Sequence, residues 1–353
     1  MSKLFSEITD FTNIHKAYVD ARRNKRFRLG ILEYGCNLEK NLLSIKRDMK
    51  NRTYVHGGYR EFIITDSKKR TINAAPFRDR VVHHMICNII EPILDRTFIY
   101  DSYACRKGKG THRAFKKLEK NLRSIKAKIP ERERELNCKI YVLKCDISKF
   151  FDNIDHNILI GLLKEKIGDK DTMWLIEKII RSHERKEGVG IPIGNLTSQL
   201  FANVYLNKLD HYIKRVLKER YYIRYMDDFI ILGTDKRKLF SVKEKIRDFL
   251  NIELKLTLHP KKSEIFPADN GIDFLGYVLK NNKRFLRKST VKRFLKRRKK
   301  ARLEESAGMI ASFTGYAKFA DSWELRKRLK FFAGLSNTPK NDIIAITASR
   351  KHK

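Results

Sequence analysis

Three aspartates stand at the ends of apolar runs, where a charged side chain is least expected. Asp146 follows the run Ile140–Cys145, and Asp227 and Asp228 divide the apolar stretch from Tyr221 to Leu232. An ionised carboxylate is costly to bury unless a cation is paired with it. Carboxylate oxygens suit Mg²⁺, which keeps coordination positions free for substrate phosphates. The three acids therefore indicate two Mg²⁺ ions, with Mn²⁺ as a substitute, and in-line phosphoryl transfer.

Other polar residues of the chain have simpler interpretations. Asp155 lies where a helix N-cap would fall, and the neighbouring Asp152 is also interpreted as a capping residue. His83 and His84 have no acid at ligand spacing, so we expect them to be structural. The five cysteines are scattered without zinc-ligand spacing, which predicts reduced thiols. The sequence contains no GxxxxGK[ST], HExxH or GxSxG pattern.

The acids must be positioned by a scaffold of helices and strands. Apolar periodicity predicts helices within residues 1–50, 76–94, 106–135, 196–216 and 239–250, and one after Asp155. Strand-like runs predict a hairpin over 59–72, a buried strand over 140–146, a hairpin over 221–232 and a short strand over 272–278. A glycine-punctuated loop lies at 188–194. This mixture predicts an α+β fold.

The charge of the chain points to a polyanionic partner. There are 78 Lys and Arg against 41 Asp and Glu, a formal net charge of +37. Nucleic acid is the first candidate, and an anionic membrane is second. No run of 18 apolar residues exists, which excludes a spanning helix, and the N-terminus has no signal-peptide core, so we expect a cytoplasmic protein. Residues 283–302 carry twelve Lys and Arg and no acid, which places a domain boundary near residue 280.

Seven short motifs occur in an order that resembles the reverse transcriptases. They are Arg70 with Pro76–Arg80, Ser102–Ala114, Asp146–Phe151, Gly190–Gln199, Tyr225–Asp228, Leu258–Ser263 and Phe274–Tyr277. The separation of the two principal acids, 227 − 146 = 81 residues, also suits that family. The motifs cover about residues 60 to 280. The resemblance implies a right-hand polymerase that copies RNA into DNA from dNTPs.

The resemblance also implies roles for individual residues. Asp146 and Asp227 would ligate both metal ions with the carbonyl of Ile147, Asp228 would be the third acid, and Lys262 would protonate the leaving pyrophosphate. Phe151 would exclude a 2′-hydroxyl from the sugar site. The further nucleotide-binding residues would be Lys68, Lys69, Arg70, Ile193, Gly194 and Gln199. The primer- or template-binding residues would be Arg78, Arg106, Lys107, Tyr225, Met226, Gly276, Lys292, Arg293 and Arg297.

One motif departs from the common pattern of reverse transcriptases. Ile193-Gly194 stands where many have Gln-Gly, and Ser198-Gln199 where many have Ser-Pro. This form resembles the bacterial or phage-encoded reverse transcriptases of diversity-generating retroelements. They copy a template-repeat RNA with errors opposite adenine and use a small basic accessory variability protein. Because Ile193 lacks the hydrogen-bonding groups of Gln, fewer polar constraints would act on a mispaired nucleotide.

The implied right hand divides the chain into an N-terminal helical segment and three functional parts. The expected boundaries are 1–50 for the N-terminal segment, 51–138 for fingers, 139–165 for the first palm strand, 166–200 for fingers and palm, 201–279 for palm and 280–353 for a basic helical thumb. Alternatives are a retron, group II intron or phage-defence reverse transcriptase. A catalytically silent RNA-binding protein or a basic structural nucleoprotein would explain the charge and leave the ordered motifs unexplained.

Overall fold

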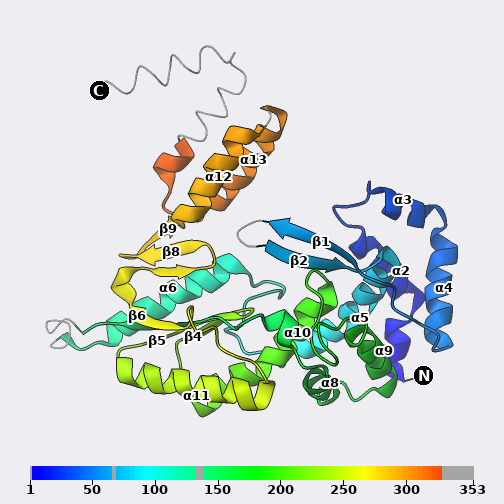
Figure 1. Cartoon of the computed structure of the whole chain (residues 1–353), viewed down its shortest axis with the longest axis horizontal. Coiled ribbons are helices and arrows are strands. Elements are labelled where there is room, and N and C mark those ends of the chain that lie inside the picture. The colour runs from blue at the N-terminus through cyan, green and yellow to red at the C-terminus, as the bar shows by residue number, and fades with distance from the viewer. Residues whose placement is uncertain (1, 66–68, 132–137, 302, 328–353) are drawn as a thin grey trace. The chain divides into compact units, whose positions relative to one another are not determined.

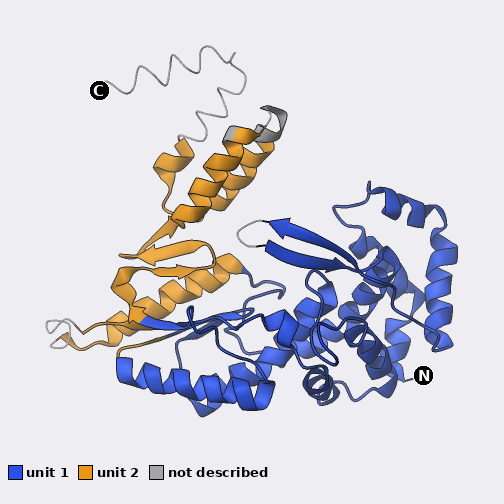
Figure 2. Ribbon diagram, in the orientation of Figure 1, with its two compact units in different colours: residues 1–110, 143–231, 236–265 blue, residues 111–142, 232–235, 266–353 orange. Residues whose placement is uncertain are grey.

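The computed structural model describes residues 2–65, 69–131, 138–301 and 303–327. Its residues divide into two compact units (Figure 2). Unit 1 comprises residues 1–110, 143–231 and 236–265, and unit 2 comprises residues 111–142, 232–235 and 266–353. Both units mix helices and strands, which confirms the expected α+β class (Figure 1).

Unit 1 begins with the helices predicted for residues 1–50. They are α1 (Lys3–Ile8), α2 (Phe11–Ala21), α3 (Leu29–Cys36) and α4 (Leu38–Lys50). Helix α2 starts where the Asp10 side chain accepts a hydrogen bond from the Thr12 amide, which satisfies one unpaired donor of its first turn. Its apolar residues Ile14 and Ala17 are fully buried, and α2 packs against α5 (Phe77–Asp95). The burial of one face explains why this basic segment folds.

The expected hairpin and its following helix are also present in unit 1. Strands β1 (Arg60–Thr65) and β2 (Lys69–Ala74) pair antiparallel, with Phe62 opposite Ile72 and Ile64 opposite Arg70. Every residue of β1 is exposed. Helix α5 follows directly and buries Val81, Met85 and other apolar residues, as its periodicity predicted.

A four-stranded sheet carries the predicted acids, in the order β4-β5-β3-β6. Its strands are β3 (Tyr141–Cys145), β4 (Tyr222–Tyr225), β5 (Asp228–Gly233) and β6 (Glu264–Pro267). Strands β4 and β5 form the expected antiparallel hairpin, and most of their residues are buried. The surrounding helices are η1 (Phe150–Asn153), α8 (His156–Lys164), α9 (Lys170–Ile180), α10 (Leu196–His211), η2 (Tyr212–Val216) and α11 (Lys236–Leu254). Figure 1 shows α11 running alongside the sheet.

Unit 2 corrects two predictions made from the sequence. It contains α6 (Thr111–Lys128), η3 (Ala268–Asn270), β7 (Ile272–Phe274), β8 (Tyr277–Lys280), β9 (Lys283–Leu286), α12 (Lys288–Lys300) and α13 (Leu303–Ala317). The single strand expected over 272–278 is wrong, because Leu275 and Gly276 take positive φ angles and reverse the chain between β7 and β8. The basic helical segment expected from residue 280 starts with a strand, and its helix α12 begins only at Lys288, because residues 283–286 pair with β8.

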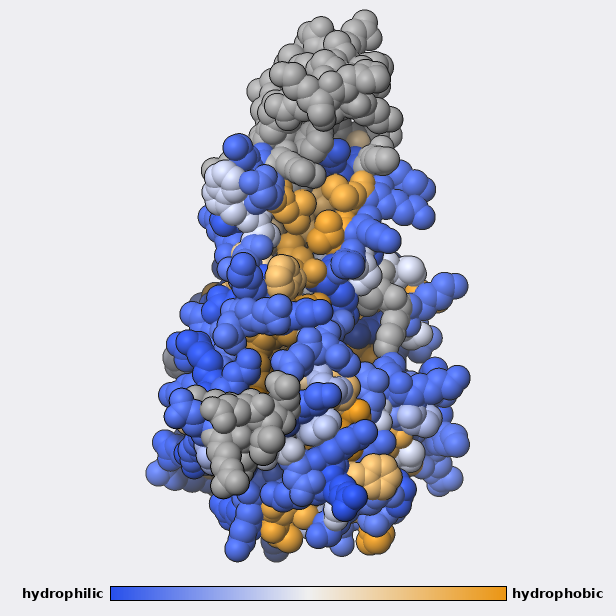
Figure 3. Space-filling model, turned by 90° about the vertical axis from the view of Figure 1, so that its left-hand side faces the viewer, coloured by the Kyte–Doolittle hydropathy of each residue, from blue (hydrophilic) through white to orange (hydrophobic). Residues whose placement is uncertain are grey.

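The surface of the chain reflects its composition. Hydrophilic residues cover most of the face drawn in Figure 3, with apolar residues gathered in smaller areas. Within the described part of the chain, no helix is both long enough and apolar enough to cross a membrane.

Candidate active site

The paired acids lie at the tight turn between β4 and β5. Tyr225 pairs with Asp228, so Met226 and Asp227 alone connect the two strands. Met226 has a φ of 56°, in the left-handed region that non-glycine residues rarely adopt. The turn therefore presents Asp227 and Asp228 in succession at the end of a hairpin whose strands are largely buried.

Asp146 is held by the chain segment that contains Lys262. Ile147 forms a bridge with Leu258, and the Ser148 amide donates to the Thr257 carbonyl at 2.9 Å. The His259 amide donates to the Asp146 carbonyl at 2.7 Å. The ammonium of Lys262 lies 2.8 Å from Asp146 Oδ2. Two motifs that are more than 100 residues apart in the sequence thus meet at one carboxylate.

The charges of Asp228, Asp146 and Arg70 all act on Asp227. Burial first, and then the charges of Asp228 and Asp146, raise the pKa of Asp227 to about 6, while Arg70 acts in the opposite direction. A carboxyl group with this pKa is one whose ionised form lacks sufficient compensation. The site therefore favours an additional positive charge.

The donor groups of this site fit Mg²⁺ by their chemistry. They are carboxylate oxygens, the ligand type that hard divalent cations prefer. Burial and then repulsion from the neighbouring acids raise the pKa of Asp227, and a bound cation would relieve both effects. The described residues nevertheless include no group of three or more His, Cys, Asp or Glu side chains already arranged as a metal site. The fit is thus one of donor type and charge.

The glycine-punctuated loop joins Phe151 to the β1–β2 hairpin. The Ile191 amide donates to the Phe151 carbonyl at 2.9 Å, and the Asn73 amide at the end of β2 donates to the Ile193 carbonyl at 3.1 Å. Asn195 fixes the same junction through its side-chain amide, which donates to the Asn73 carbonyl at 2.9 Å. The predicted sugar-contacting and nucleotide-binding motifs therefore lie side by side in unit 1.

Gly194 makes a close approach that only glycine permits. Its φ is +113°, and a Cβ atom there would lie 2.8 Å from Cγ2 of Ile72 in β2. Both observations exclude a larger residue without movement of the hairpin. Arg70 and Lys69 are exposed on the same strand, whereas Lys68 lies outside the described residues.

Three predicted primer- or template-binding residues have protein partners in the structure. Arg106 donates to both carboxylate oxygens of Asp95, and its side chain is only 8% exposed. Arg78 lies 2.7 Å from Asp48 and is 32% exposed. Lys107 is highly exposed and lies 3.7 Å from Glu91. Arg106 consequently has a packing role, and contact of these three residues with nucleic acid stays a prediction.

The predicted residues of unit 2 form a separate group. The Tyr316 hydroxyl donates to the Gly276 carbonyl at 2.9 Å and holds the β7–β8 turn. On α12, Lys292 and Arg297 are exposed and Arg293 is half-buried. The apolar side of α12 packs on α13, with the rings of Phe294 and Phe313 stacked at a centroid distance of 3.8 Å.

The capping interpretation holds for Asp155 but is wrong for Asp152, which lies inside η1 and is 3.9 Å from Arg185. Asp155 is the N-cap of α8, and its side chain accepts a hydrogen bond from the Ile158 amide. His83 is buried against His56, and burial first and His56 second lower its pKa to about 3. All five cysteines are free.

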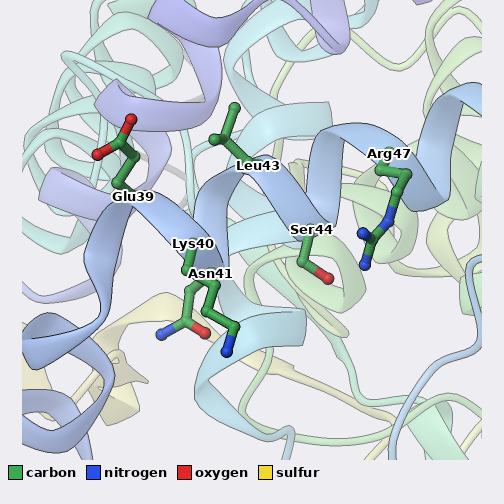
Figure 4. A pocket seen from close by; sticks show the side chains of 6 residues that line it. All are labelled: Glu39, Lys40, Asn41, Leu43, Ser44 and Arg47. Carbon is green, nitrogen blue, oxygen red and sulfur yellow. The ribbon is translucent and has the colours of Figure 1, made fainter.

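A hollow of about 700 Å³ on α4 lies apart from the predicted acids. It is lined by Glu39, Lys40, Asn41, Leu43, Ser44 and Arg47. Figure 4 shows that all these side chains come from one helix. The hollow contains none of the residues that the sequence motifs single out.

Sequence reasoning missed two buried residues that shape the site. His156 is fully buried and donates through Nε2 to the Gly190 carbonyl at 2.7 Å, which fixes the glycine loop. Arg224 is also fully buried and donates to the Met226 carbonyl at 3.1 Å. The available signal was the presence of an arginine inside an apolar strand, which requires a buried acceptor.

An antiparallel sheet that presents carboxylates at a hairpin turn and at a neighbouring strand end defines the class of palm-containing polymerases. Residues 62–279, more than half of the chain, match the model of the family "Reverse transcriptase (RNA-dependent DNA polymerase)". The chain belongs to this family.

Individual relatives agree with this assignment. Protein YkfC of Escherichia coli K12 is 26% identical over 254 residues, which are 61% of this chain and 64% of that protein. Group II intron-encoded protein LtrA of Lactococcus lactis is 26% identical over 326 residues, covering 72% of this chain and 51% of LtrA. The chain thus spans about half to two thirds of these curated relatives. A solved apo telomerase from Candida tropicalis shares the fold, with a TM-score of 0.51 at 12% identity over 72% of this chain and 51% of the telomerase chain.

Proposed function

We propose that the chain is an RNA-directed DNA polymerase that extends a primer with deoxynucleotides. The observation that carries the proposal is the acid cluster of Asp146, Asp227 and Asp228 inside a chain with a net charge of +37. In such a protein, cations are available to neutralise buried carboxylates. Asp227 instead keeps a pKa raised to about 6 by burial and by its acidic neighbours. A buried carboxylate whose charge Arg70 compensates only in part is suited to divalent metal ions.

The proposed chemistry assigns a task to each residue of the site. Asp146 and Asp227 would hold two Mg²⁺ ions, which would supply charge stabilisation to the attacking and leaving oxygens. Asp228 adds negative charge beside them. Lys262, within 2.8 Å of Asp146, is placed to give a proton to the leaving pyrophosphate. Arg70 and Lys69 bind the triphosphate, and Arg70 is suited to it because a guanidinium forms paired hydrogen bonds with phosphate oxygens.

Selection of the nucleotide is assigned to the loop that contacts Phe151. Phe151 limits the space beside the sugar, and its carbonyl accepts a hydrogen bond from the Ile191 amide of this loop. Ile193 is connected to Asn73 in the same way and lies next to Gly194. We expect a shift of this loop to alter both sugar selection and base selection.

Primer extension tests the proposal. An RNA template, a DNA primer, dNTPs and Mg²⁺ are incubated with the wild type and with Asp227→Ala, and the products are sequenced. Extension by the wild type that is lost in the variant supports the proposal. An RNA-binding protein without catalysis would bind the primer–template and extend nothing in either form, which would refute the polymerase assignment.

We further propose the diversity-generating type as the finer assignment. The residues that support it are Ile193 and Gln199 in the loop motif, and it would bring a template-repeat RNA and a small basic accessory protein as partners. The predicted consequence is errors concentrated opposite template adenines. Ile193→Gln should lower that error rate, and an unchanged rate opposite adenine would refute the role given to Ile193.

A group II intron type is the second candidate. It is supported by the similarity to the group II intron-encoded protein LtrA over 72% of this chain. Accurate DNA synthesis at adenines would favour this type. The same sequencing experiment therefore separates the two candidates.

A further inference from the structure

Arg224 is the largest fully buried side chain in the described part of the molecule, and all its donors have acceptors. Its Nε and Nη2 each lie 2.7 Å from one oxygen of Asp210, which is also fully buried. Nη1 donates to Asn203 Oδ1 at 3.2 Å and to the Met226 carbonyl at 3.1 Å, and Nη2 donates to Ser102 Oγ at 3.2 Å. These contacts account for the five N–H groups of a guanidinium.

The cluster of Ser102, Asn203, Asp210, Tyr222 and Arg224, here called the anchor cluster, joins three separate elements. Asp210 and Asn203 come from α10, and Arg224 and Tyr222 from β4. The Tyr222 hydroxyl donates to Asp210 at 2.6 Å. The backbone of Arg224 bonds on both sides to the segment around Ser102, through the Asp101 carbonyl and the Tyr103 amide, each at 3.0 Å. One side chain thus connects a helix, a strand and a fingers segment.

The charge of this cluster is fully compensated. Burial works against the guanidinium charge, but Asp210 outweighs it, and the pKa of Arg224 lies above its ordinary value. A buried ion pair of this kind contributes little net stability compared with apolar residues of similar size, because desolvation offsets the attraction. We therefore expect the Arg224–Asp210 pair to contribute to the geometry of its surroundings more than to stability.

The part of the structure affected is the turn between β4 and β5, here called the catalytic turn, which contains Met226 and Asp227. The Met226 carbonyl that Arg224 holds belongs to the peptide bond leading directly into Asp227. Met226 takes a left-handed conformation, which is unfavourable for a non-glycine residue and needs support from its surroundings. Among the five Arg224 donors, one supplies that support and the other four fix the guanidinium itself.

We propose that Arg224, oriented by Asp210, is a positioning residue that sets the place of Asp227. Through Ser102 and its backbone bonds, it also couples the fingers segment 101–104 to the catalytic turn. The inference rests on the proposed polymerase function for its activity readout. Its structural readout, the order of the turn, is independent of that function.

The central test compares Arg224→Lys with the wild type. Lysine keeps the charge opposite Asp210 but cannot also reach the Met226 carbonyl and Ser102. We expect kcat for primer extension to fall by about 10²-fold, as a misplacement of about 1 Å can cause, with little change in the KM for dNTPs. Amide hydrogen exchange at residues 225–229 should accelerate, and the rise in Tm on adding Mg²⁺ should shrink.

A matched control uses an ion pair remote from the turn. Arg52→Met removes the contacts of Arg52 with Asp171 and with the rings of Phe5 and Trp174 in unit 1. It should lower Tm without changing the exchange rate at residues 225–229 or the Mg²⁺-dependent rise in Tm. A general loss of stability is thereby separated from a displaced turn.

Asn203→Ala provides a milder variant in case Arg224→Lys does not fold. It removes one acceptor of Nη1 and leaves the Arg224–Asp210 pair, so a smaller loss of kcat and smaller acceleration of exchange are expected. Normal kcat and normal exchange in a folded Arg224→Lys, or in Asn203→Ala, would overturn the inference. If the wild type and Asp227→Ala are equally inactive, the polymerase assignment fails, while the exchange experiment still decides the role of Arg224.

Discussion

Arg224 and Asp227 are three residues apart, yet their environments are opposite. In the anchor cluster, Arg224 and Asp210 are completely buried and each neutralises the other. At the turn, burial together with the charges of Asp228 and Asp146 raises the pKa of Asp227 to about 6. The comparison teaches that a carboxylate fixes geometry where a buried guanidinium neutralises it. A carboxylate whose charge is compensated only in part instead favours the binding of an added cation. Substitutions in the anchor cluster and substitutions at the turn should therefore have different effects.

The largest effect on primer extension is expected from removing the Asp227 carboxylate. Asp227→Ala should reduce primer extension by about 10³-fold or more, since several kcal/mol of charge stabilisation at 1.36 kcal/mol per tenfold would be lost. Steady-state extension rates measure the change. Asp248→Asn, on the exposed side of α11, is the control and should retain the wild-type rate. Residual activity within tenfold of the wild type would contradict the catalytic role of Asp227.

Lys262→Met sharpens the comparison by removing the ammonium group that lies 2.8 Å from Asp146. Loss of a proton donor should lower kcat by about 10²-fold. Without competition from the ammonium, however, Mg²⁺ should raise Tm by more than in the wild type. Calorimetry with and without Mg²⁺, together with extension rates, measures both effects. Lys262→Arg keeps the charge, and a Mg²⁺ response equal to that of Lys262→Met would argue against competition.

The pH dependence of the unfolding free energy measures how incompletely the charge of Asp227 is compensated. The folded-state pKa of Asp227 is about 6 against an ordinary value of 3.8. Its stabilising effect as a neutral acid is therefore present below about pH 4 and is lost as the pH rises to about 6. In metal-free buffer, Asp227→Asn should come close to the wild type near pH 4 and exceed its unfolding free energy by about 3 kcal/mol well above pH 6. Denaturant unfolding across this range provides the test, and a constant difference would contradict the raised pKa.

The smallest effect is expected from Lys255, which belongs neither to the anchor cluster nor to the turn at Asp227. Lys255 lies 2.7 Å from Asp155 and is 65% exposed. Lys255→Met should change the unfolding free energy by less than about 1 kcal/mol and leave extension unchanged. Asp155→Ala should cost about 1 kcal/mol, because the N-cap of α8 is also lost. Equal stabilities of the two variants would show that the cap contributes nothing.

The sequence predicted those elements whose periodicity is strong and local. The β4–β5 hairpin, helix α5 and the N-cap at Asp155 all depend on residues close together in the chain. The β7–β8 turn was missed because a leucine gives no local indication of a positive φ angle, although Gly276 beside it does. Strand β9 was missed although Asn281 and Asn282, both with positive φ, are typical hairpin-turn residues.

The partners of charged residues were harder to predict than the residues themselves. Motif order identified Asp146 and Lys262, but their ion pair depends on two segments brought together by the sheet. Arg106 was assigned to nucleic acid, since nothing local in the sequence shows that it lies against Asp95. Arg224 was overlooked for the same reason, because its acceptors Asp210, Asn203 and Ser102 lie on other elements. Pairing of this kind is a property of tertiary structure.

The left-handed conformation of Met226 also has a consequence for mutation and selection. The positive φ angle restricts which residues can replace Met226, whatever the chemical properties of their side chains. β-Branched valine and isoleucine bear the highest conformational cost at positive φ, whereas glycine and asparagine bear little. A randomised library at residue 226 should therefore be depleted first in residues that are stiff at Cβ. Evolution can adjust the position of the neighbouring acid through this residue without ever replacing the acid.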